Sequence, residues 1–136
     1  MTDLYKMFET DSSLEREGFW YKVSENTGFL LARAGGHNTR FVKALEVKTR
    51  PYRRQIENGT LDGELGNELL RDAFAETVIL DWTGVSDRNG KAVKFSPKAA
   101  AALLKELPDL FADLQEAASK SANFRKGGIE EDAGNS

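Results

Sequence analysis

The pattern of apolar and polar positions divides the chain into a short extended region followed by helical segments. Residues 19–23 and 29–33 form two apolar runs, which begin with aromatic residues and flank a polar turn that contains Gly28. Two such runs joined by a short turn with glycine are typical of a β-hairpin. Because a lone hairpin is only marginally stable in water, we expect it to pack on helices or to join another strand.

Amphipathic periodicity predicts helices in the middle of the chain. The most regular pattern runs from about Glu64 to Trp82, where apolar side chains recur every three or four residues and acidic side chains occupy the other face. An earlier helix is predicted to begin after Asn38, which would cap its N-terminus. Pro51 should kink that helix or start a second one, because proline lacks a backbone donor and clashes with the preceding turn.

Two further helices are predicted near the C-terminus. Ser96 and Pro97 combine a hydroxyl cap with proline at the first helical position, which is a strong start signal. The helix that follows should end before Pro108, and a last one should run from about residue 109 to residue 125. Residues 91–95 read as a short extended piece that could pair with the hairpin.

These elements predict a mainly α fold of the α+β class, with four to five amphipathic helices and a small β-hairpin near the N-terminus. The length of 136 residues is typical of one domain. Residues 1–18 have few apolar anchors, and we expect them to form a mobile N-terminal arm. Residues 19–126 should form a single helical domain that includes the hairpin. Residues 127–136 are predicted to be a disordered acidic tail.

The composition argues against catalytic and metal-binding chemistry. The chain has no cysteine and one histidine, His37. Zinc sites are usually built from several cysteine and histidine ligands, and a Ser-His-Asp mechanism would depend on His37 alone. We therefore expect no enzymatic activity, no catalytic residue, no metal site and no cofactor. No apolar stretch approaches the roughly 18–20 residues that span a bilayer, and the lack of cysteine fits a reducing cytoplasm.

Charge is distributed unevenly along the sequence. Residues 30–56 contain seven basic residues and one acid, about +6, whereas residues 57–87 contain eight acids and one base, about −7. Asymmetry of this kind indicates a partner or self-association. Either the two segments neutralise each other within one subunit, or subunits stack with basic surface on acidic surface. The candidate interaction residues in these blocks are Arg33, Arg40, Arg53, Arg54, Glu68, Asp72 and Glu76.

A row of acids four residues apart, from Glu64 to Glu76, is more typical of a solvated helix face than of a catalytic pair. The Gly-rich segment 35–38 opens a helix and could attract an anion, but it matches no phosphate-binding pattern. We interpret it as a strand-to-helix turn. Residues 87–90 faintly resemble part of an EF-hand loop. If Gly90 took the glycine position of that loop, its first and last ligands would be Val85 and Ser96, where acidic residues are required.

Nucleic-acid binding is the main alternative function. Lysines and arginines between Arg33 and Arg54, with Phe41 and Tyr52 nearby, could contact phosphates. Against this, the whole chain is acidic, with a net charge of −3. No recognition helix with its turn can be fitted to the segment. A small nucleic-acid-binding or regulatory protein therefore remains the alternative.

Several short strings occur in a fixed order along the chain. They are ARAGGHNTRF at residues 32–41, AETVILDWTGV at 75–85 followed by Asp87 and Gly90, FS at 95–96, LPDLF at 107–111 and NFR at 123–125. This ordered set resembles the tail assembly chaperones of long-tailed (siphophage-type) bacteriophages. No single string is diagnostic, but the ordered set at this spacing is fairly specific. The resemblance covers the chain from about Phe29 to Arg125.

The resemblance implies a non-catalytic protein of phage or prophage morphogenesis. Members of that family bind the tape measure protein, keep its long helices soluble and help to recruit tail tube (major tail) protein subunits. They act in the host bacterial cytoplasm and are absent from the mature virion, and homo-oligomers are possible. A chaperone of helical clients needs an apolar groove with an adaptable charged rim. We expect that groove between the 64–82 helix and the last two helices, with Trp82 and Phe111 as possible anchors or else as core residues.

Overall fold

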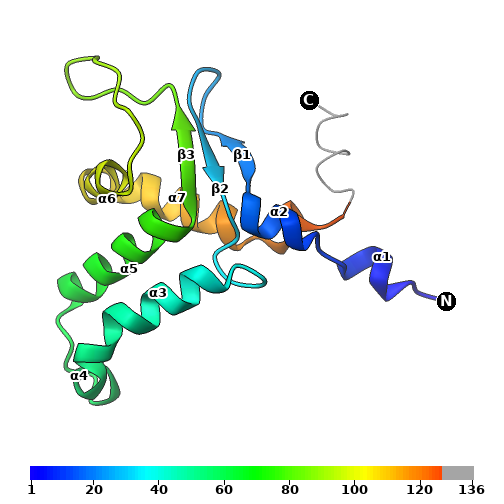
Figure 1. The fold of residues 1–136 in the computed structure, drawn as a ribbon, viewed down its shortest axis with the longest axis horizontal. Helices are drawn as coiled ribbons and strands as arrows, with labels where there is room; N and C mark the ends of the chain where they lie inside the picture. The colour runs from blue at the N-terminus through cyan, green and yellow to red at the C-terminus, as the bar shows by residue number, and fades with distance from the viewer. Residues whose placement is uncertain (127–136) are drawn as a thin grey trace.

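The computed structural model describes residues 1–126, and Figure 1 shows the arrangement of its helices around a small sheet. The elements in chain order are α1 (Leu4–Phe8), α2 (Ser12–Glu17), β1 (Phe19–Lys22), β2 (Gly28–Leu31), α3 (Thr39–Thr49), the 3-10 turn η1 (Arg50–Tyr52), α4 (Arg53–Glu57), α5 (Gly63–Thr77), β3 (Ile79–Thr83), α6 (Pro97–Glu106), α7 (Pro108–Ser119) and the 3-10 turn η2 (Ser121–Phe124). The predicted α+β class, mainly helical with a hairpin near the N-terminus, is confirmed.

The sheet has three antiparallel strands in the order β1-β2-β3. The hairpin pairs Phe19 with Leu31, and β2 in turn pairs Phe29 with Trp82 of β3. The hairpin therefore gains the third strand that its stability requires.

The identity of that third strand differs from the sequence prediction. The helix predicted over residues 64–82 ends at Thr77, and Ile79–Thr83 continues as β3. An apolar run that follows a helix fits either a further helical turn or a strand, and the β-branched and aromatic residues here favour the strand. Residues 91–95 do not pair with the hairpin; Ala92 forms only an isolated bridge with Ser86 in the loop before α6.

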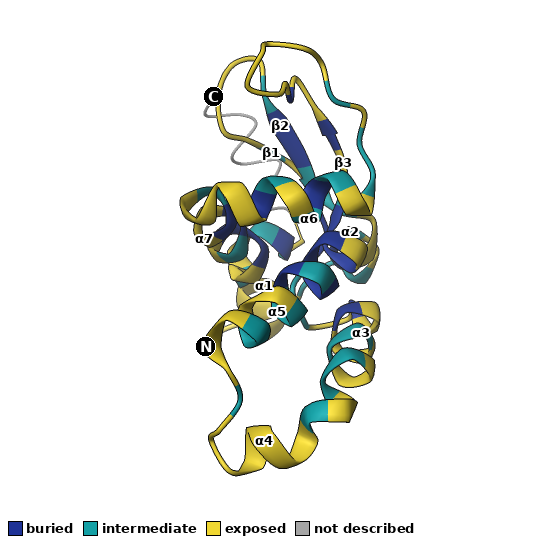
Figure 2. Cartoon of the chain, turned by 90° about the vertical axis from the view of Figure 1, so that its left-hand side faces the viewer, coloured by how far each residue is buried: buried dark blue, intermediate teal, exposed yellow. Residues whose placement is uncertain are grey.

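The hydrophobic core lies where α5 meets α3, α6, α7 and the sheet. Phe74 of α5 makes edge-to-face contacts with Phe41 of α3 and Phe111 of α7, at centroid distances of 6.3 and 5.3 Å. Buried residues gather at this junction in Figure 2, whereas α4 is exposed along its length. The body of the protein is thus built around α5.

Local signals explain most of the helix boundaries. The Ser96 hydroxyl accepts a hydrogen bond from the Ala99 amide at 3.0 Å, so the predicted start of α6 is confirmed. Pro51 lies in η1, which separates α3 from α4, so the predicted break at this proline is confirmed. Asn38 precedes α3 but does not cap it. Its side-chain amide instead donates to the carbonyls of Arg33 and Thr77, at 2.9 and 3.2 Å, and joins the segment after β2 to the C-terminal end of α5.

The first 18 residues contain two short helices. In α1 no residue is buried, whereas α2 places the Glu15 side chain fully inside the protein. The mobility predicted for residues 1–18 stays a prediction, although α2 has buried contacts. The acidic tail predicted over residues 127–136 lies outside the described residues.

Candidate protein-binding groove

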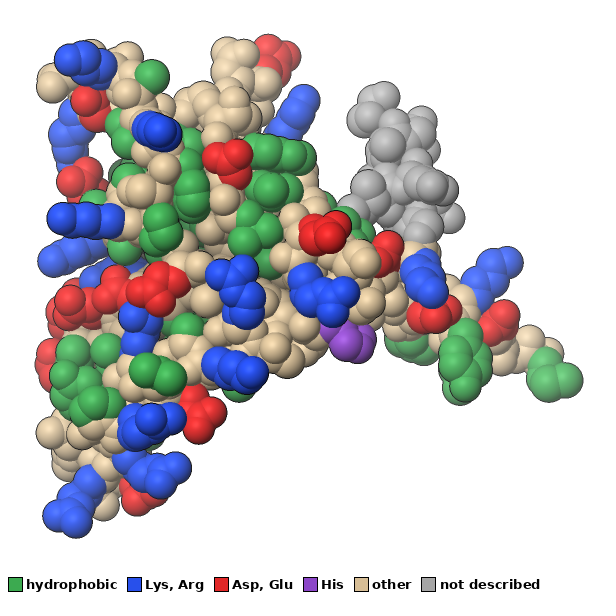
Figure 3. All heavy atoms as spheres, viewed as in Figure 1, with side chains coloured by type: hydrophobic (Ala, Val, Ile, Leu, Met, Phe, Trp, Pro, Cys, Tyr) green, Lys and Arg blue, Asp and Glu red, His purple; other side chains and the backbone are tan. Residues whose placement is uncertain are grey.

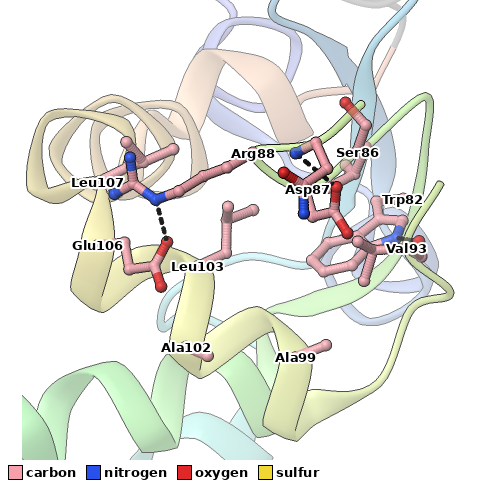
Figure 4. A pocket seen from close by; sticks show the side chains of 12 residues that line it. Trp82, Ser86, Asp87, Arg88, Val93, Ala99, Ala102, Leu103, Glu106 and Leu107 are labelled. Carbon is pink, nitrogen blue, oxygen red and sulfur yellow. Dashed lines mark hydrogen bonds and ion pairs between the residues drawn. The ribbon is translucent and has the colours of Figure 1, made fainter. Parts of the chain in front are cut away.

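An open groove lies between helix α6 and the loop that joins β3 to α6. Its volume is about 630 Å³, and Figure 4 shows its two walls. One wall is the exposed side of α6, including Ala99, Ala102 and Leu103, and the other is the segment from Val85 to Val93. Trp82 lies at the base. We call this cavity the α6 groove.

The loop wall is held in shape by its own hydrogen bonds. The Val93 amide donates to the Val85 carbonyl at 2.9 Å, and the Trp82 indole donates to the Val93 carbonyl at the same distance. At the tip, the Asp87 carboxylate accepts hydrogen bonds from the amides of Asn89 and Lys91 at 2.9 and 3.0 Å. A wall braced in this way preserves the groove without an occupant.

The groove is apolar inside and charged at its rim. Leu107, at the end of α6, is 46% exposed although it is a large apolar side chain. On the rim, the Arg88 guanidinium and the Glu106 carboxylate approach to 3.9 Å, and both side chains are largely exposed. Exposed pairs of this kind are weak, so the rim charges are available to a partner. The arrangement suits the binding of an apolar segment.

The two aromatic residues predicted as anchors have different positions. Trp82 is 7% exposed and forms part of the floor of the α6 groove. Phe111 is 8% exposed and packs against Phe74 in the core, and it does not line the groove. Both side chains belong to the hydrophobic core, and only Trp82 also lines the α6 groove. A smaller cavity of about 320 Å³ lies between α5 and α6, where it is lined by Asp72, Glu76, Pro97, Lys98 and Ala101. A client site between α5 and the last two helices stays a prediction.

The predicted basic residues do not form one site. Arg33 pairs with the buried carboxylate of Glu15 on α2, and Figure 1 shows α2 well away from α4. Arg40, Arg53 and Arg54 are exposed along α3 and α4, where Lys and Arg side chains gather in Figure 3. None of these three makes an ion pair within residues 1–126.

The predicted acidic residues lie along α5. Glu68 is exposed and Asp72 is half-buried, and neither forms an ion pair among the described residues. Glu76 accepts a hydrogen bond from the Lys48 ammonium of α3 at 2.8 Å. The basic and acidic helices thus meet within one subunit at this pair. Stacking between subunits through the two charge blocks stays a prediction.

A polar cluster that the sequence did not indicate joins α2 to the turn before α3. The buried Glu15 carboxylate contacts the Arg33 guanidinium and the His37 imidazole. Burial opposes ionisation of Glu15, but the hydrogen bonds from Arg33 and His37 outweigh it, so the pKa of this carboxyl lies below its ordinary value. Gly36 has φ of +55°, and a Cβ there would collide with Glu15 and Arg33. The cluster ties α2 to the turn before α3.

Comparison with known families identifies the group to which the sequence belongs. Residues 36–135 match the family described as YdaY prophage protein, and this span is well over half of the chain. The chain belongs to the YdaY prophage protein family. No curated protein and no solved structure gives a significant match. The chain is therefore a phage or prophage protein.

The span shared with the YdaY prophage family includes α3 to α7 and the whole α6 groove, but not α1, α2 or the hairpin. No cluster of three or more His, Asp or Glu side chains that could hold a metal ion occurs within residues 1–126 of this family member. No helix in the same range is long and apolar enough to cross a membrane.

Proposed function

We propose that this prophage protein is a non-catalytic tail assembly chaperone, whose α6 groove binds the tape measure protein. In this role it keeps the long helices of the tape measure soluble and helps to recruit tail tube subunits. It acts in the host cytoplasm and is absent from the mature virion. The proposal joins the resemblance in the ordered strings between residues 32 and 125 with membership of a prophage family.

The observation that carries the proposal is the α6 groove itself. An amphipathic helix binds a groove through apolar side chains at three- and four-residue spacing, and its polar residues meet the charged rim. Trp82, Val93 and Leu103 offer the apolar floor, and Arg88 and Glu106 offer rim charges of both signs. The volume of about 630 Å³ lies within the ~300–1,000 Å³ range of pockets that bind specific ligands.

The test is co-expression with the tape measure protein encoded in the same gene neighbourhood. The proposal predicts that the tape measure is insoluble alone, becomes soluble with this chain and elutes with several copies of it. A tape measure that stays insoluble and unbound in the presence of abundant, folded protein would refute the proposal. A soluble, inactive protein of similar size serves as the control for a general effect of co-expression.

Nucleic-acid binding is kept as a second candidate because of one observation on the surface. Arg40, Arg53 and Arg54 are exposed on α3 and α4, and no ion pair within residues 1–126 neutralises them. Phosphate contacts from these side chains would make binding fall steeply with salt. DNA titrations at increasing salt concentration test this. The double variant Arg53→Gln, Arg54→Gln should bind DNA more weakly, and its affinity should fall less steeply as the salt concentration rises.

A further inference from the structure

We propose that residues 1–8 of one copy, here named the apolar arm, dock into the α6 groove of a second copy, so that copies associate head to tail. The apolar arm comprises α1 and the three residues before it. The inference rests on the arm and groove of the chain itself and is independent of the chaperone role.

The apolar arm exposes an unusual concentration of large apolar side chains. Leu4, Tyr5, Met7 and Phe8 are each half to four-fifths exposed, and α1 buries none of its residues. Leu4, Met7 and Phe8 follow the i, i+3, i+4 spacing of a helix that binds a groove. Exposed apolar clusters of this kind mark interaction sites. Figure 3 shows hydrophobic side chains on the segment that projects from the body.

The base of the arm is attached at the end of the molecule opposite the groove. The Asp11 amide donates to the Phe124 carbonyl at 2.7 Å, and the Lys126 amide donates to the Glu9 carbonyl at 3.2 Å. From this attachment α1 extends outward, and Figure 1 places it at one end of the long axis and α6 near the other. The arm therefore suits the groove of another copy rather than its own.

An acid on the arm complements a base on the rim of the groove. Asp3 lies at the N-terminus of α1, which it caps by accepting a hydrogen bond from the Lys6 amide at 3.1 Å. Lys6 lies on the side of α1 opposite to Leu4, Met7 and Phe8, so its side chain does not face the groove. On the rim, the Arg88 guanidinium approaches Glu106 only to 3.9 Å and can pair with Asp3 of the other copy.

A contact between two different surfaces leaves each copy with one free arm and one free groove. Such heterologous contacts build rings or open chains. The surfaces involved are α1 and α6, which differ from the charge blocks on α3 and α5. A helical client that enters the α6 groove would compete with the arm for the same site.

The test is sedimentation velocity of the full chain at increasing protein concentration. The wild type should associate, and Leu4→Asp with Met7→Asp in the arm, or Ala102→Glu in the groove, should each weaken association by roughly tenfold or more. Ala102 is exposed and lies four residues before Glu106. Ala112→Glu is its matched control, because exposed Ala112 lies four residues before Glu116 on α7. Val47→Asp is the control for the arm.

A mixture of the arm variant and the groove variant gives the most specific outcome. The arm variant retains a functional groove, and the groove variant retains a functional arm. The mixture should therefore form heterodimers that cannot extend into longer chains. A wild type that stays monomeric at every concentration, or a mixture that fails to associate, would overturn the inference. A wild type that is monomeric but still solubilises the tape measure protein would overturn this inference and leave the proposed function standing. Circular dichroism checks that each variant is folded.

Discussion

Replacement of Phe74 by alanine should lower the free energy of unfolding by about 3–5 kcal/mol. Phe74 is 1% exposed and is the aromatic ring through which α5 contacts both α3 and α7. Its removal leaves a cavity between three helices and deletes two edge-to-face contacts. Because small domains are stable by only about 5–15 kcal/mol, this loss is a large part of the total.

Urea denaturation followed by circular dichroism measures this change in the free energy of unfolding. In a thermal denaturation, the melting temperature should fall by about 10–20 °C for a domain of this size. Val47→Ala is the control, because Val47 is a helical residue with an exposed side chain. A loss for Phe74→Ala no larger than that of the control would contradict the position assigned to Phe74 at the centre of the core.

Replacement of Glu15 by glutamine should cost about 3 kcal/mol, because it removes one partner of a buried ion pair. The Arg33 guanidinium is held by Glu15 and is itself mostly buried, so the variant leaves a cation without its counter-ion. Glu17→Gln changes an exposed carboxylate of the same helix and serves as the control. Urea denaturation of the two variants at neutral pH compares them directly.

The same substitution should alter how stability depends on pH. The pKa of Glu15 is lower in the folded protein, where Arg33 and His37 hydrogen-bond its carboxylate, than in the unfolded chain. Its contribution is therefore complete above about pH 4.3, the ordinary pKa of glutamate, and is lost as the pH falls through the lower folded-state pKa. The acid-induced fall in the free energy of unfolding should be shallower in Glu15→Gln. An unchanged slope would show that Glu15 does not contribute in this way.

Features set by neighbouring residues were predictable from the sequence. The hairpin, the break at Pro51 and the start of α6 at Ser96 all depend on turn, proline and capping chemistry within a few positions. The strand β3 was not predictable in this way, because Ile79–Thr83 becomes a strand by pairing with β2, which lies about 50 positions earlier in the chain. The local pattern of apolar residues carries no information about so distant a partner.

The candidate site was predictable only in part, for the same reason. Trp82 and Phe111 were predicted as possible anchors or else as core residues, and both are buried in the core. Of the two, only Trp82 also lines the groove. The sequence predicted an extended piece at residues 91–95 but not its partner, because Ala92 pairs with Ser86 and the Val93 carbonyl accepts a hydrogen bond from the Trp82 indole. The contacts of Glu15 with Arg33 and His37 likewise join segments that are distant in the sequence.

The most direct test of the account is co-purification of the tape measure protein with groove variants. Tagged wild type, Ala102→Glu and Ala112→Glu are each co-expressed with the same tape measure protein, and the amount recovered per copy of the tagged chain is compared. The account predicts strong recovery with the wild type and Ala112→Glu and a loss of roughly tenfold or more with Ala102→Glu. Equal recovery by all three would show that the α6 groove is not the client site, and recovery by none would contradict the chaperone function itself.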